Sequence, residues 1–131
     1  MTNSQRVKLN DYLSGLSDVA QTALPIGCVR CRETDMATVV TAVSKVAIDV
    51  FSIKPDQPSI VDPVVAALGN GRRVAINIDK EIPPDIVRLL DKTSAGYLAA
   101  PAGALIVVMV NAQTDDSPIS QFITSYCDIS K

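Results

Sequence analysis

The first quarter of the chain repeats apolar residues at spacings of three and four, which is the spacing of one face of an α-helix. Asn3 or Ser4 can cap the start of this helix, and Pro25 stops it. Gly15 lies inside the pattern and weakens the helix by about 1 kcal/mol relative to Ala, so packing must stabilise it. The apolar positions are Leu9, Tyr12, Leu13, Leu16, Val19, Ala20, Ala23 and Leu24.

A second helical pattern follows Asp35, which can act as its N-cap. Its many β-branched residues favour a strand by propensity, whereas their spacing favours a helix, and we follow the spacing. We therefore predict a helix through Phe51 and a surface loop over residues 52–59, which contain Pro55 and Pro58. The apolar positions of this helix are Val39, Val40, Val43, Val46, Ala47, Val50 and Phe51.

Three further helices are predicted from prolines placed in a first helical turn, where the missing N–H group costs nothing. The first ends in a glycine and is followed by a turn at Asn70 and Gly71. The last begins at Ser117 and places Phe122 and Tyr126 on one face. These helices cover residues 62–69, 83–90 and 117–126.

Strand patterns lie between the predicted helices. Alternating polarity predicts a strand over residues 72–79. An apolar run on both faces predicts a central strand over residues 104–110. Two shorter strands are predicted over residues 26–31 and 97–100. The alternation predicts one α/β domain over residues 1–131, with a small mixed, largely parallel sheet of about four strands packed by helices on its faces. An α+β layout with one antiparallel edge is the alternative.

Composition narrows the functional classes. Apolar residues make up 47% of the chain and aromatic residues 4%, which suits an aliphatic core and disfavours base stacking. The net charge of −2 gives no general attraction to nucleic acid or anionic membranes, so nucleic acid is a partner only through local contacts. No signal peptide or long apolar run is visible, and three cysteines form an odd number. We expect a soluble protein in the reducing cytoplasm, without membrane contact.

Cys28 and Cys31 form a C-x-x-C pair, which can carry dithiol redox chemistry. In an extended segment, however, their side chains point to opposite faces and cannot form a disulfide without a turn. The chain has no His, so familiar nucleophilic triads are excluded and the third cysteine does not complete a zinc site. We therefore expect no metal and no cofactor.

Arginines and carboxylates offer candidate contacts for ligands. Arg72 and Arg73 follow a glycine-rich turn and, with Arg30 and Arg32, form the predicted anion-binding set. The acidic pairs Asp79 and Glu81, and Asp115 and Asp116, follow predicted strands, where open α/β sheets usually bind ligands. Loop solvation and helix-start charge are the favoured explanation of these acidic residues, because no other candidate residue converges on them.

The leading hypothesis is a non-enzymatic interaction or assembly module. It would act as a homo-oligomer or as an accessory subunit of a larger complex, such as a viral or nucleoprotein assembly, so its partners are itself and an unidentified protein. Candidate interface residues are Tyr97, Leu98, Phe122 and Tyr126. The alternatives are a dithiol oxidoreductase and an accessory protein that binds nucleic acid or another anion through its arginines.

Overall fold

The computed structural model describes residues 1–54, 56–98 and 100–131. None of the helices in these ranges is both long and apolar enough to cross a lipid bilayer. The elements, in chain order, are α1 (Asn3–Val19), β1 (Ile26–Cys31), η1 (Glu33–Asp35), α2 (Met36–Ser44), β2 (Asp49–Ile53), α3 (Val61–Gly69), β3 (Arg73–Ile78), α4 (Pro84–Ser94), β4 (Leu105–Asn111), η2 (Ser120–Phe122) and β5 (Ser125–Asp128), where η denotes a 3-10 helix.

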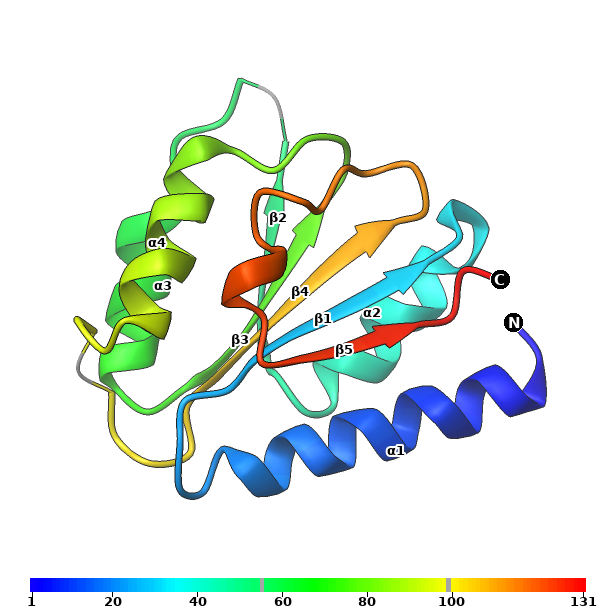
Figure 1. Ribbon diagram of the computed structural model, residues 1–131, viewed down its shortest axis with the longest axis horizontal. Coiled ribbons are helices and arrows are strands. Elements are labelled where there is room, and N and C mark those ends of the chain that lie inside the picture. Colours follow the sequence, from blue (N-terminus) through cyan, green and yellow to red (C-terminus); the bar gives the residue numbers. More distant parts are fainter. Residues whose placement is uncertain (55, 99) are drawn as a thin grey trace.

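The strands form one sheet in the order β2-β3-β4-β1-β5, and every neighbouring pair is parallel (Figure 1). This confirms the predicted α/β class. The described sheet has five strands rather than about four, and it has no antiparallel edge. Strand β4 lies at its centre and is buried from Leu105 to Val110, as its two apolar faces predicted.

Helices cover both faces of the sheet and enclose two hydrophobic clusters. Helices α3 and α4 and the segment around η2 pack on one face, while α1 and α2 pack on the other. Successive residues of β4 alternate between the faces, so Val108 joins the first cluster and Met109 the second. All three cysteines are buried in these clusters, and the structure forms no disulfide among them.

The second predicted helix is too long. Helix α2 ends at Ser44, and residues 49–53 form strand β2 instead. This strand pairs with β3 from Asp49 opposite Val74 to Ile53 opposite Ile78. The β-branched and aromatic side chains of this segment therefore follow their strand propensity once a partner strand is available.

The predicted C-terminal helix is also wrong. Residues 120–122 form only the short η2, and residues 125–128 form β5, which pairs with β1. Ile119 still reaches the core, but the open side of β1 offers backbone hydrogen bonds that a local pattern does not reveal. In the predicted strand at 97–100, residues 97, 98 and 100 are not in a strand, and Ala99 lies outside the described residues.

The first helix is shorter than predicted and has a different cap. It begins after Thr2, whose hydroxyl accepts the Gln5 N–H at 3.1 Å while the Gln5 side chain accepts the Thr2 N–H at 2.7 Å. It ends at Val19, five residues before the last apolar position of its pattern. Figure 1 shows α1 running alongside β5, with the two ends of the chain close together.

Candidate functional site at the carboxyl end of the sheet

The connections that leave β1 and β4 separate to opposite faces of the sheet. After β1 the chain enters η1 and α2 on one face, whereas after β4 it passes to η2 on the other. These two strands are neighbours, so their diverging loops open a crevice above the carboxyl ends of the strands. Open α/β sheets generally bind ligands at such a point.

An open crevice of about 760 Å³ lies at this point. Its walls are formed by the residues that end or directly follow β1, β3 and β4, which are neighbours in the sheet. The volume falls in the range of about 300–1,000 Å³ that is usual for small-molecule sites. The lining residues are Arg32, Glu33, Thr34, Asp79, Lys80, Glu81, Asn111, Ala112 and Gln113.

Asn111 joins two walls of the crevice. Its side-chain N–H donates to the backbone oxygen of Asp79 at 2.9 Å. Its side-chain oxygen accepts the Gln113 N–H at 2.9 Å and the Thr114 hydroxyl at 3.2 Å. The loop after β4 is therefore tied to the end of β3 and to its own next turn. Sequence reasoning missed Asn111, although a polar residue directly after the apolar run of residues 104–110 was an available signal.

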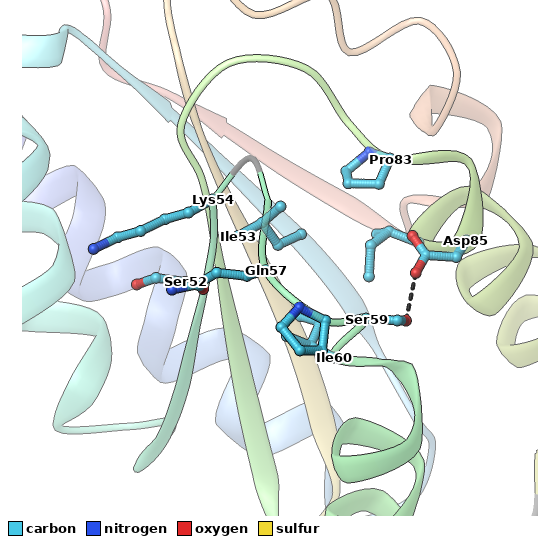
Figure 2. A pocket seen from close by; sticks show the side chains of 10 residues that line it. Ser52, Ile53, Lys54, Gln57, Ser59, Ile60, Pro83 and Asp85 are labelled. Carbon is cyan, nitrogen blue, oxygen red and sulfur yellow. Dashed lines mark hydrogen bonds between the residues drawn. The ribbon is translucent and has the colours of Figure 1, made fainter.

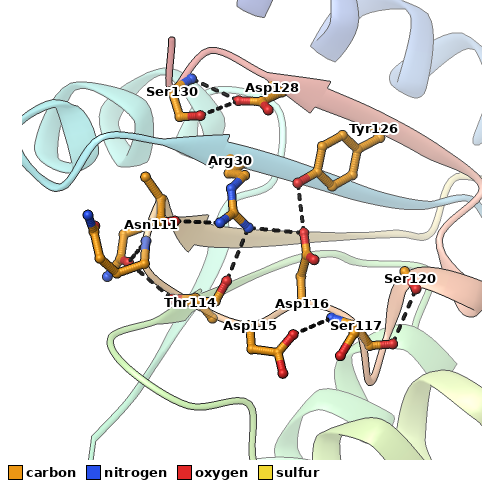
Figure 3. Close-up of polar contacts among 12 residues, drawn as sticks. Arg30, Asn111, Thr114, Asp115, Asp116, Ser117, Ser120, Tyr126, Asp128 and Ser130 are labelled. Atoms are coloured by element: carbon orange, nitrogen blue, oxygen red, sulfur yellow. Dashed lines mark hydrogen bonds and ion pairs between the residues drawn. The ribbon is translucent and has the colours of Figure 1, made fainter.

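Arg30, on β1, holds the same loop through several hydrogen bonds, as Figure 3 shows. Its guanidinium donates to the backbone oxygens of Ala112 and Thr114 and to the carboxylate of Asp116, the last at 3.2 Å. Tyr126 donates its hydroxyl to the same carboxylate at 2.7 Å. Because these donors are occupied and the side chain is only 20% exposed, Arg30 acts as a positioning residue rather than a free anion site.

Electrostatics reinforces this network. Burial alone would lower the pKa of Arg30, but hydrogen bonding with Tyr126 and the charge of Asp116 raise it. Burial, together with the hydrogen bond to Asp116, raises the pKa of Tyr126 well above its ordinary value. Arg30 is therefore charged and Tyr126 protonated at neutral pH, which keeps the loop connection intact.

Arg32 is the more accessible arginine at this end of the sheet. Its side chain is 53% exposed and contacts Asp35 at 3.3 Å. Hydrogen bonds from the Met1 amino group and from Arg32 lower the pKa of Asp35, which stays ionised. Arg32 is also the N-cap of η1, and its side chain does not cap the following backbone N–H groups. The Asp35 N–H donates to the Arg32 oxygen at 2.9 Å, which leaves the N–H groups of Glu33 and Thr34 to favour an anion.

The charges of the crevice are divided between its walls. Arg32 follows β1, whereas Asp79 and Glu81 follow β3, and the end of β4 lies between them. Lys80 adds a second cation on the β3 side. Glu33 lines the crevice beside Arg32, so each side of the crevice carries one cation together with at least one carboxylate.

The four predicted anion-binding arginines do not come together. Arg72 and Arg73 lie at the amino end of β3, and six residues of parallel strand separate that end from the crevice by about 20 Å. Arg72 pairs with both carboxylate oxygens of Asp49, at 2.5 and 2.8 Å. Arg73 donates to the Gly103 oxygen at 3.1 Å and to the Ser17 hydroxyl at 2.6 Å. Only Arg32 remains a candidate in the crevice.

The C-x-x-C pair is divided by the sheet. Cys28 lies in the cluster beneath α3 and α4, and Cys31 lies in the cluster beneath α1 and α2. Burial, followed by the charge of Asp116, raises the pKa of Cys28 to about 12. Burial and the charge of Asp35 raise the pKa of Cys31 to about 11. Protonated, buried thiols on opposite faces argue against a dithiol mechanism.

A smaller hollow of about 150 Å³ lies between the end of β2 and the start of α4, shown in Figure 2. Ser59 donates its hydroxyl to Asp85 across this hollow, at 2.5 Å. Lys54 and Ile53 line it from the strand side. Its volume is below the usual range for ligand sites, so the carboxyl-end crevice is the stronger candidate.

The predicted interface residues belong to separate elements. Tyr97, which follows α4, is 84% exposed, and Tyr126 on β5 is 46% exposed. Leu98 and Phe122 instead pack against the cluster beneath α3 and α4. A contact role for Tyr97 remains a prediction, but these residues do not share one helical face.

The part of the chain that the structure describes brings together no cluster of three His, Cys, Asp or Glu residues suited to a metal ion. The fold and crevice thus define an open, parallel α/β domain with a polar crevice at the carboxyl end of its sheet. No model of a known protein family matches the chain, and neither does the sequence of any curated protein.

Proposed function

We propose that the protein is a non-enzymatic binding module whose ligand occupies the carboxyl-end crevice. The observation that carries this proposal is the meeting of three neighbouring strand ends at one crevice, which Arg32 lines on the β1 side and Asp79 and Glu81 line on the β3 side. Arg30 and Asn111 support the loop between these walls before any ligand arrives. A loop held in place loses little conformational freedom on binding, which favours affinity.

The charge distribution favours a ligand with two different ends. Arg32 and the backbone N–H groups at the start of η1 suit a phosphate group. Asp79 and Glu81 would repel a second phosphate but accept hydrogen bonds from hydroxyl groups. The ligand class that fits both walls is a phosphate monoester of a polyhydroxyl compound, which includes sugar phosphates and nucleoside monophosphates.

The chemistry of the chain supports binding rather than catalysis. It has no His to serve as a general base. The thiols of Cys28, Cys31 and Cys127 are buried in the two hydrophobic clusters, where they are unsuited to act as nucleophiles.

Titration with ribose 5-phosphate, followed by amide NMR shifts, tests this proposal. We expect shifts at residues 32–34, 79–81 and 111–113, and weaker binding of ribose or inorganic phosphate alone. Arg32→Gln should weaken binding about tenfold, because a charge-assisted hydrogen bond contributes about 1.5–3 kcal/mol and this side chain is half exposed. Asp79→Asn should reduce the advantage of ribose 5-phosphate over inorganic phosphate.

Arg72→Gln is the matched control, because Arg72 lies at the opposite end of the sheet. It should leave binding unchanged. Shifts that cluster away from the crevice, an absence of shifts at millimolar ligand, or an equal loss of binding in the control variant would each refute the proposal.

A further inference from the structure

The two edge strands of the sheet, β5 and β2, differ in whether side chains form hydrogen bonds with their backbone. Helix α1 runs along β5 (Figure 1). Its side chains donate to backbone oxygens of the C-terminal segment. Lys8 donates to the Asp128 oxygen at 2.8 Å and Tyr12 to the Ser125 oxygen at 3.0 Å. Gln5 donates to the Ile129 oxygen at 3.1 Å. These contacts occupy acceptors that another strand would need.

Strand β2, at the other edge, has no such cover. Among the described residues, no side chain forms a hydrogen bond with the backbone of residues 49–53, and only β3 pairs with the strand. The sequence of this segment contains no proline and no lysine, the residues that commonly protect an edge. Its one charged residue, Asp49, is already paired with Arg72.

Apolar side chains accompany this open edge. Ile48, just before the strand, is 77% exposed, and Val50, Phe51 and Ile53 are each only partly buried. Helix α2 packs mainly on β3 and β4, so it leaves the Ile48 end of β2 largely uncovered on its face of the sheet. Unpaired backbone of β2 and the exposed side chain of Ile48 therefore lie next to each other at this edge of the sheet.

We infer that β2 pairs in antiparallel fashion with β2 of a second copy of this chain, about a twofold axis perpendicular to the sheet. Such an axis keeps each face of one sheet continuous with the same face of the other. The partly buried side chains on each face of β2 then meet their own counterparts, which makes the edge self-complementary.

Charge favours this orientation. Asp49 begins β2 and Lys54 directly follows it, so an antiparallel copy keeps the two Asp49 side chains, and likewise the two Lys54 side chains, at opposite ends of the paired strands. A parallel copy would instead place like charges side by side. The net charge of −2 per chain imposes little repulsion between whole copies. A second copy is therefore the occupant that the edge fits best.

The test is solution mass by sedimentation or light scattering over a concentration series, with Ile48→Lys compared to wild type. We expect a reversible dimer whose dissociation constant rises at least about tenfold in Ile48→Lys, because the variant places a charge on the buried edge. Val7→Lys is the matched control, since Val7 is an exposed aliphatic residue (53%) on α1. It should dimerise like wild type.

Hydrogen exchange supplies a second readout that needs no variant. Amides in residues 49–53 should gain protection as the protein concentration rises, whereas those in residues 125–128 should not. A strict monomer at all concentrations, a dimer unaffected by Ile48→Lys, or protection confined to other segments would overturn the inference. None of these outcomes bears on the crevice, because Ile48 does not line it.

Discussion

Gly27 occupies a position in β1 where a single added methyl group meets two side chains of α1. A Cβ atom built there lies 2.5 Å from the Tyr12 hydroxyl oxygen and 2.8 Å from Cδ2 of Leu16. That hydroxyl accepts the Cys28 N–H at 3.0 Å and donates to the Ser125 oxygen at 3.0 Å. It therefore joins the helix to β1 and β5 at once.

The cost of Gly27→Ala can be worked from these contacts. Displacing the hydroxyl leaves the Cys28 N–H without its partner, which costs about 1–3 kcal/mol. Moving Leu16, which is 4% exposed, adds about 1–3 kcal/mol of overpacking. We expect a total loss of about 2–6 kcal/mol, a large part of the 5–15 kcal/mol usual for a domain.

Urea unfolding followed by far-UV circular dichroism measures this loss, since the chain has no Trp to report fluorescence. Gly15→Ala is the matched control: nothing lies within 4 Å of the added methyl, and this variant should gain about 1 kcal/mol. In a Tyr12→Phe background the added Gly27→Ala should cost at least about 1 kcal/mol less, because the clash with the hydroxyl is gone. A loss below about 1 kcal/mol for Gly27→Ala, or strict additivity with Tyr12→Phe, would refute the reasoning.

Three further results are expected. Cys28 and Cys31 should react with a thiol reagent at pH 7 only as fast as the protein opens, because burial raises their pKa values to about 12 and 11; rapid labelling of the native protein would contradict this. Stability measured by urea unfolding should fall below about pH 4, since hydrogen bonds from an arginine lower the pKa of Asp49 and the unfolded chain takes up its proton first. Stability should also fall by about 1.4 kcal/mol per pH unit above about pH 9, because the Cys28 thiol ionises there in the unfolded chain but not in the folded protein. A stability that does not change at either pH extreme would contradict both expectations. Arg30→Met should cost about 2–4 kcal/mol, because it removes the donor to the Ala112 and Thr114 backbone oxygens and the charge that pairs with Asp116. Arg88→Met on the exposed side of α4 should change stability by less than about 0.5 kcal/mol, and equal effects of the two variants would argue against the positioning role.

The local pattern of the sequence determined the central strand β4 and helices α1, α3 and α4. The run from Leu105 to Val110 is apolar on both faces, and a strand with that pattern can only lie in the middle of a covered sheet. Helices α1, α3 and α4 follow from apolar spacing and from prolines in first turns, although cap and end positions shift by a few residues. The opposite facing of Cys28 and Cys31 follows from the period of an extended segment.

The tertiary structure alone decided the two edge strands and the site. Residues 49–53 and 125–128 carry spacings that also suit a helix, and pairing with β3 and β1 makes them strands. Strand order then separates Arg32 from Arg72 by the length of the sheet and brings Arg32, Asp79 and Asn111 to one crevice. The physical reason is that backbone pairing joins segments far apart in the chain. The local spacing of apolar residues therefore does not indicate which strands become neighbours.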